Sequence, residues 1–362
     1  MRARTARTRM SKTSRQWAPR WLGCVVVVAT AGTTLASCVV NENDVHRWGT
    51  TEHGPDKLVA VVGHDKYAWQ LRDEAALELM RMKPRSGRRV GINRLVESLA
   101  QLTPEDRKKL IDDLRPTIVA ELKKAPPAAA PGQAAPPDPS YAYKDATMAI
   151  LTYDRAVLVS DEAARKELTD ALIFWSLHDF DRRLDNTTQM FGMEQMMRAF
   201  GAPAVRGLPA LITPDSTKYD RITSLVAELG DQPTREANAA KLVEMARYTS
   251  SQAWIDKQKP GVEEANKASK ITPTPEQLQK QLAQYQDEAL TKVFASLKKV
   301  GTRAAVDCCL QVASDKAQNE KLRQAALAAL EGRLDRSNQG DIDKVLRRRA
   351  FPPSCARMDL PR

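Results

Sequence analysis

The sequence predicts an all-α protein built from pairs of short antiparallel helices, and three observations support this. Only 5% of residues are aromatic and glycine is scarce, at 16 of 362, while Ala, Leu, Lys, Glu and Gln dominate the periodic stretches. These residue types favour helix. Apolar residues recur at helical spacing, as they do at Ile92, Leu95, Val96 and Leu99. No segment alternates Val, Ile and Thr between hairpin turns, as a strand would.

The chain is expected to hold a signal followed by two helical blocks on a spacer. The predicted segments are a signal peptide (1–37), a polar tether (38–54), a helical block (55–124), a linker (125–140), a second helical block (141–346) and an irregular tail (347–362). The linker holds six prolines, so we expect it to be stiff and extended. We also expect irregular chain at 259–275.

The first 37 residues have the order of a secretory signal. Seven basic residues and no acid occupy positions 2–20, and an apolar run follows from Leu22 to Ser37. This run is shorter than the roughly 20 apolar residues that span a bilayer. It ends in Leu35-Ala36-Ser37-Cys38, which resembles the lipobox of bacterial lipoproteins. The alternative is ordinary secretion, with cleavage after Ala31.

The lipobox resemblance implies that Cys38 is the first mature residue and carries lipid, including a fatty acid such as palmitate, on its sulfur and its amine. It therefore implies a protein of the cell envelope that is held on a membrane by a lipid anchor. Val39 follows the cysteine in place of the aspartate that retains such proteins at the inner membrane. We expect the outer membrane, with the protein facing the periplasm.

The charge balance argues against nucleic acid as a partner. The whole chain has 56 Lys and Arg against 45 Asp and Glu, a net charge of +11. Without the seven basic residues of the signal the balance is 49 against 45, or +4. Nucleic-acid binding calls for a concentrated basic face, which this near balance does not offer. The partners that we expect are a membrane and an unknown protein.

Two stretches repeat the same pattern of residues. Asp65 precedes Leu71-Arg72 and Ala75-Ala76, and Asp315 precedes Leu322-Arg323 and Ala325-Ala326. This pattern resembles the HEAT repeat, and the resemblance implies an α-solenoid interrupted by the proline-rich linker. It also implies that Asp65, Arg72, Asp315 and Arg323 are structural framework residues. A solenoid leaves a long face open, so the resemblance implies a protein-interaction scaffold.

One basic turn is a candidate contact for a partner. Lys83, Arg85, Arg88 and Arg89 lie within seven residues, and clustered positive charge attracts acidic partners or phosphate. Lys and Arg also gather at helix C-termini without any partner, because they interact favourably with the helix dipole.

Three further groups offer metal or acid–base chemistry, and for each we prefer a structural interpretation. His46, His53 and His64 lie close together in the sequence, but no helical spacing relates them. His178, Asp181 and Asp185 would share one helix stripe, which we expect to be a solvated face with Arg182 and Arg183 as partners. The thioethers of Met190, Met193, Met196 and Met197 suit Cu(I), yet their spacing is also that of a packed helix.

Neither a cofactor nor an enzymatic activity is predicted. The sequence has no nucleophile elbow, P-loop, dinucleotide fingerprint or HExxH motif. Adjacent Cys308 and Cys309 are expected to be small buried residues, not a redox pair. Two alternatives stay open: an enzyme or ligand carrier with a pocket in the helical block, and an envelope lipoprotein that binds a metal such as Cu(I).

The amino-acid composition changes near the end of the sequence. Asp341 to Leu346 begins what looks like another helix, and 347–362 then bring arginines, prolines and Cys355. We expect this tail to be a truncated or frame-shifted end and not a natural cap of the helical array. The alternative is a basic tail that contacts a membrane or a partner.

Overall fold

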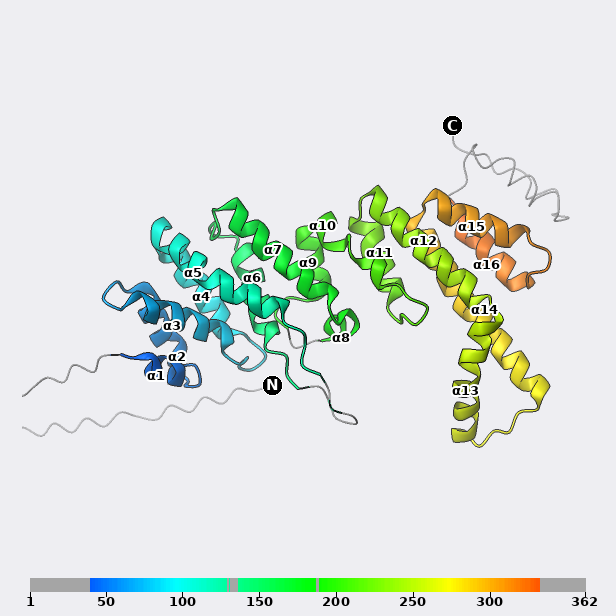
Figure 1. Ribbon diagram of the computed structural model, residues 1–362, viewed down its shortest axis with the longest axis horizontal. Coiled ribbons are helices and arrows are strands. Elements are labelled where there is room, and N and C mark those ends of the chain that lie inside the picture. Colours follow the sequence, from blue (N-terminus) through cyan, green and yellow to red (C-terminus); the bar gives the residue numbers. More distant parts are fainter. Residues whose placement is uncertain (1–39, 129, 131–135, 187–188, 333–362) are drawn as a thin grey trace, which may run out of the picture. The chain divides into compact units, whose positions relative to one another are not determined.

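The structure is a computed structural model that describes residues 40–128, 130, 136–186 and 189–332 (Figure 1). By its contacts the chain divides into two compact units, 1–40 and 41–362, and the described fold belongs to the second. Within the described residues every regular element is a helix, so the all-α prediction is confirmed for this part of the chain.

Sixteen α-helices and one 3₁₀-helix make up the described part. The helices before the middle of the chain are α1 (Glu42–Trp48), α2 (Gly54–Gly63), α3 (Trp69–Arg81), α4 (Val90–Gln101), α5 (Pro104–Lys123), α6 (Ser140–Leu151), α7 (Glu162–Leu177) and α8 (Phe180–Asp185). The others are α9 (Met193–Phe200), α10 (Ala202–Val205), η1 (Leu208–Leu211), α11 (Tyr219–Leu229), α12 (Gln232–Thr249), α13 (Gln252–Ala268), α14 (Pro275–Val300), α15 (Arg303–Ser314) and α16 (Glu320–Leu330).

The helices pack on neighbours that are close in the sequence. Helix α2 contacts α3 and α4, α5 contacts α6 and α7, and α14 contacts α12, α15 and α16. Leucines fill these contacts, and Leu58, Leu79 and Leu95 have 0% of their surface exposed. Burying such side chains contributes roughly 1.5–3 kcal/mol each, so the packing between adjacent helices is the main source of stability.

The helices on either side of residues 125–140 pack directly on each other. Helix α5 precedes this segment, α6 and α7 follow it, and α5 contacts both, while α6 also contacts α3 and α4. The two helical blocks that we expected from the sequence therefore share an interface. Every residue of α6 is buried, which is typical of a helix surrounded by others.

Among the described residues, six helix pairs share an arginine at the fourth position of the second helix. In five of these pairs the arginine donates to a backbone carbonyl in the last turn of the first helix. One is the bond from Arg183 of α8 to the carbonyl of Trp175 in α7. The others are Arg72 Nε to Val62 O (2.9 Å), Arg107 Nη1 to Leu99 O (3.5 Å), Arg165 Nη2 to Leu151 O (3.3 Å) and Arg323 Nε to Ala313 O (3.2 Å). Arg235 holds the same position in α12, and its Nε is buried. Last-turn carbonyls lack hydrogen-bond donors within their own helix and form the negative end of its dipole. An arginine placed there donates a hydrogen bond to such a carbonyl and brings a positive charge to the negative end.

The arginines fix the register between the two stretches that repeat in the sequence. When Arg72 is aligned with Arg323, Leu71 matches Leu322, with 8% and 3% of their surfaces exposed, and Ala75 matches Ala326, both 0% exposed. The two turn aspartates do not match in this register, because Asp65 precedes its arginine by seven residues and Asp315 by eight. The side chain of Asp315 accepts from Ala317 N and Gln318 Nε2, whereas Asp65 is exposed.

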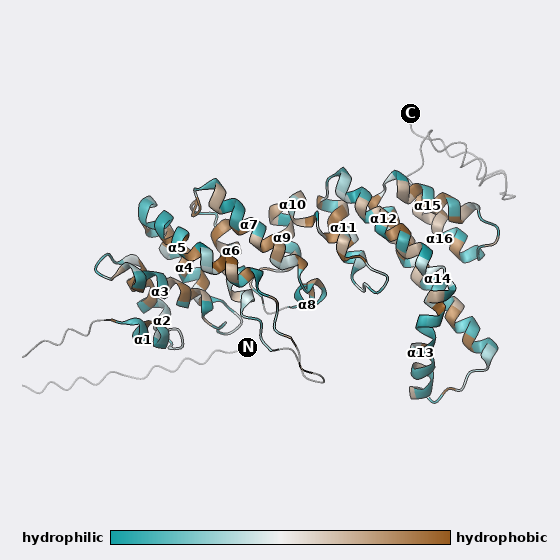
Figure 2. Ribbon diagram, viewed as in Figure 1, coloured by the Kyte–Doolittle hydropathy of each residue, from teal (hydrophilic) through white to brown (hydrophobic). Residues whose placement is uncertain are grey.

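The structure corrects the sequence analysis at two helices. Residues 42–48 were assigned to a tether, yet they form α1, which begins with a reciprocal capping box between Asn41 and Asp44. Residues 259–268 were expected to be irregular, yet they continue α13 through Pro260. Each helix buries a single residue, Val45 in α1 and Trp254 in α13. Figure 2 shows that α13 is mostly hydrophilic. A helix with so few apolar residues has no apolar periodicity to predict it from the sequence, so its second half was not predicted.

Candidate functional site

Two adjacent charged residues, Lys144 and Asp145, lie at the centre of the buried helix α6. Both side chains are 0% exposed, and Lys144 Nζ donates to Asp145 Oδ1 at 2.6 Å. Lys144 Nζ also donates to Gln189 Oε1 at 2.8 Å and to the carbonyl of Phe191. Asp145 accepts from the backbone N–H groups of Met190 at 2.9 Å and Phe191 at 3.2 Å. The pair therefore attaches residues 189–191 to α6.

Arg89 completes this buried charged network. Its Nε lies 2.6 Å from Asp145 Oδ2, and only 9% of its side chain is exposed. Arg89 was a candidate partner contact, and in the structure it pairs within the chain. Arg85 is also engaged within the chain, since it donates to the carbonyls of Thr51 (2.5 Å) and Glu52 (2.8 Å). Lys83 and Arg88 remain exposed.

A second charged network lies at the N-terminal end of α6. Arg183 is 0% exposed and donates to Asp138 Oδ2 at 3.1 Å and to the carbonyl of Trp175. Its guanidinium lies 4.1 Å from the centre of the Trp175 ring, and the Trp175 indole donates to Ser140 at 2.7 Å. Arg183 was expected to be solvated, so its position corrects that expectation. A guanidinium tolerates such burial when a carboxylate and an aromatic face accompany it.

Lys144 has the lowered pKa of a reactive amine, but its amino group is not accessible to a substrate. Burial lowers the pKa of its ammonium group from 10.5 to about 8, although Asp145 acts in the opposite direction. A lysine with a lowered pKa is a common nucleophile. The ammonium group has three N–H donors, however, and its three acceptors are Asp145, Gln189 and Phe191. Lys144 is therefore a positioning residue.

The segment held by this network forms one wall of an open cavity of about 350 Å³. Met190 and Phe191 provide this wall, and α4 and the C-terminal end of α6 provide the others. The lining residues are Asn93, Val96, Glu97, Ala149, Thr152, Tyr153, Asp154, Arg155, Met190 and Phe191. We call this cavity the α4–α6 groove. Its volume lies in the range of ligand-binding pockets, and Met190 is 39% exposed there.

The methionines separate into a core group and a surface residue. Met193, Met196 and Met197 lie on α9 with at most 1% of their surfaces exposed. This matches the packed helix that the spacing favoured. Met190 precedes α9 and lies at the groove, so it is not part of that stripe.

The other candidate chemistry does not assemble as the sequence suggested. His178 caps the C-terminus of α7 and stacks on Phe174 at 4.1 Å, while Asp185 is the last residue of the separate helix α8 and pairs with Lys218 at 2.8 Å. His53 and His64 are exposed. Within the described chain, the side chains that gather at the spacing of metal ligands are His46, Glu74 and Glu78. Neither glutamate was singled out in the sequence, because both come from a different helix.

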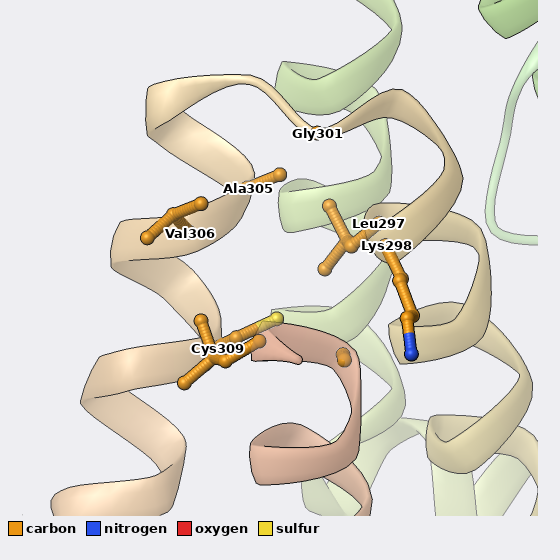
Figure 3. Close-up of a pocket in the computed structure, with 8 residues that line it drawn as sticks. Leu297, Lys298, Gly301, Ala305, Val306 and Cys309 are labelled. Carbon is orange, nitrogen blue, oxygen red and sulfur yellow. The ribbon is translucent and has the colours of Figure 1, made fainter. Parts of the chain in front are cut away.

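Cys309 is a buried packing residue, as expected, whereas Cys308 is only half-buried. Cys309 is 2% exposed, and burial raises the pKa of its thiol to about 12. Figure 3 shows Cys309 with Leu297, Ala305 and Val306 around a gap between α14, α15 and α16. This gap has no room for a water molecule, so it is an ordinary packing defect and not a ligand site.

The predicted lipid-attachment residue Cys38, the signal at 1–37 and the tail at 347–362 lie outside the described residues. None of the helices in the described ranges is long and apolar enough to cross a membrane. No family model matches this chain, and the searches of curated proteins and of solved structures likewise found no match.

Proposed function

We propose that this protein is a helical-repeat scaffold that binds another protein in the α4–α6 groove and is held on the outer membrane by lipid at Cys38. The observation that carries the binding proposal is the use of a buried charged network to hold one wall of an open groove. Burying charges costs several kcal/mol per ion before pairing. The hydrogen bonds that offset this cost run from Lys144 and Asp145 to residues 189–191, so the buried charges hold this segment in place.

The lining of the groove suits a peptide segment with an apolar side chain. Val96, Ala149, Met190 and Phe191 offer apolar contact, and Glu97, Asp154 and Arg155 offer polar contact. Interfaces combine an apolar centre with a polar rim in this way. We propose an α-solenoid for the array of helix pairs, supported by the recurrent arginine and by the packing of helices on neighbours close in sequence.

No catalytic role is part of this proposal. The buried lysine has the electrostatics that favour chemistry, but its donors all bind groups of this chain. We therefore propose that the groove binds its partner without catalysing a reaction.

A photo-reactive amino acid placed at Met190 in living cells tests the groove. We expect one discrete cross-linked adduct, because Met190 lies at the wall of the groove. The matched control places the same amino acid at Ile271, an apolar residue that is 52% exposed away from the groove lining. The absence of an adduct from Met190, or the same adducts from both positions, would refute the proposal.

The anchor is tested separately by Cys38→Ser. Since the lipid would be attached to the cysteine sulfur, the variant should move from the membrane fraction to the soluble fraction or stay uncleaved. An unmodified N-terminus elsewhere, found by mass spectrometry of the parent chain, would refute the anchor.

A further inference from the structure

Three metal-binding side chains from two helices meet at the surface of α3. Glu74 and Glu78 lie four residues apart on α3, and His46 reaches them from α1. One ligand atom from each of the three residues lies within 4.8 Å of the other two. The two glutamates are 24% and 16% exposed and His46 is 49% exposed, so the cluster is accessible from solvent.

The distances suit a small divalent ion. His46 Nδ1 lies 3.1 Å from Glu78 Oε1 and 3.7 Å from Glu74 Oε1. Bonds of about 2.0–2.2 Å to nitrogen and oxygen in a tetrahedral zinc site place its ligand atoms about 3.3 Å apart. The two separations in the structure lie on either side of that value. An imidazole and two carboxylates leave a fourth position open, as in zinc sites that also hold water.

The fold brings these groups together through contacts of its own. The capping box of Asn41 and Asp44 starts α1, and Val45, next to His46, is 0% exposed and fixes α1 on the core. A side chain at Gly49 would bring its Cβ into steric conflict with Glu78 Oε2, so the glycine leaves the space that this carboxylate occupies.

One neighbouring cation opposes metal binding. Arg81 Nη1 lies 3.0 Å from Glu74 Oε1 and 3.8 Å from Glu78 Oε1. Its Nε donates at 2.8 Å to the hydroxyl of Tyr143, which is 4% exposed. That bond anchors the guanidinium on the α6 side. These are the same two oxygens that lie near His46 Nδ1, so Arg81 competes with an ion for them and lowers its affinity.

We propose that His46, Glu74 and Glu78 form a binding site for one Zn²⁺ ion that joins α1 to α3. The site is separate from the α4–α6 groove and does not depend on the function proposed for it. When bound, the ion replaces the direct contact between His46 and Glu78 and adds its binding free energy to the packing of α1. Helix α1 is therefore more stable in the metal-bound chain.

Calorimetric titration of ZnCl₂ into the full-length chain in detergent tests this site. We expect one ion per chain and at least about tenfold weaker binding for His46→Ala and for Glu78→Gln, because each removes a ligand. His53→Ala and His64→Ala are the matched controls and should bind like the parent. Arg81→Gln should bind more tightly by several-fold, because it removes a positive charge next to the ligands. A structural ion pair alone predicts no zinc binding in any of these chains.

Circular dichroism of each variant checks that it is folded. Should His46→Ala lose helix, Glu74→Gln and Glu78→Gln decide the question, because they keep the shape of the side chain and remove its charge. Zinc should also raise the thermal midpoint of the parent and not that of Glu78→Gln. The proposal is overturned by a parent chain that binds no zinc, or by unchanged affinity in the folded His46 and Glu78 variants.

Discussion

Asp145 is the residue on which the buried network depends. It is 0% exposed and pairs with both Lys144 and Arg89. Asp145→Ala should therefore lower the free energy of unfolding by about 3–5 kcal/mol, the cost of leaving buried charge unpaired. Urea unfolding measures this, with Asp170→Ala as the control. Asp170 forms an exposed pair with Lys166, and its loss should cost about 0.5 kcal/mol or less. Equal effects of the two substitutions would show that the network is not buried.

Asp73 should make the protein less stable at neutral pH than in mild acid. Burial and the nearby charge of Asp113 raise the pKa of Asp73 from 3.8 to about 6, and its Oδ1 is buried with no hydrogen-bond partner. The folded chain thus holds more protons than the unfolded chain between about pH 4 and 6, so the contribution of Asp73 to stability falls as pH rises through that window.

Asp73→Asn removes this dependence. We expect the variant to be about 1 kcal/mol more stable than the parent at pH 7, a value reduced for partial exposure, and equally stable near pH 4. Urea unfolding at the two pH values measures the difference. A variant that is less stable than the parent at pH 7 would contradict the assigned shift.

At the level of single residues, sequence analysis found some framework positions and missed others of the same kind. Arg72 and Arg323 were recognised because leucine and alanine accompany them. Arg107, Arg165 and Arg235 have different neighbours, and what they share is a helix N-cap four residues earlier: Thr103, Asp161 and Asp231. A search for a cap residue followed by arginine at this spacing would have found all three.

At the level of elements, the bond from arginine to carbonyl should contribute measurably to each helix pair. Arg72 is 4% exposed, donates to Val62 O, pairs with Asp106 at 3.1 Å and stacks 4.3 Å from the Trp69 ring. Arg72→Ala should cost about 2–4 kcal/mol of unfolding free energy, because it leaves a buried carbonyl unpaired. Arg47→Ala is the control, since Arg47 is 68% exposed. A cost below about 0.5 kcal/mol for Arg72→Ala would show that this bond does not stabilise the helix pair.

Helices with a wide apolar face were predicted well, and helices with little to bury were not. Leu110, Ile111, Leu114, Ile118 and Leu122 are all buried on α5, as their spacing predicts. Helices α1 and α13 bury one residue each, so the capping box of α1 and the contacts of α13 with α12 and α14 decide their structure. The candidate groove was also beyond sequence analysis, because Asp145 binds Met190 and Phe191 across about 45 residues of chain.

At the level of the whole chain, we expect the linker to be cleaved easily and the two resulting fragments to stay together. Residues 125–140 are rich in proline and lie between helices that pack on each other. Limited proteolysis should cut within this segment, because six of its sixteen residues are prolines, which have no backbone N–H to donate to regular structure. The two fragments should still elute together in size-exclusion chromatography, since α5 contacts α6 and α7. Fragments that separate without denaturant would show that this interface is weak.

The central claim is that the α4–α6 groove binds a partner protein. Once cross-linking from Met190 has identified that partner, its dissociation constant for the purified chain tests the claim most directly. Met190→Glu places a charge at the apolar wall and should weaken binding about 30-fold or more, equivalent to about 2 kcal/mol. Ile271→Glu, which adds the same charge at an exposed residue outside the groove, should bind like the parent. Equal affinities for the parent and Met190→Glu would contradict the claim.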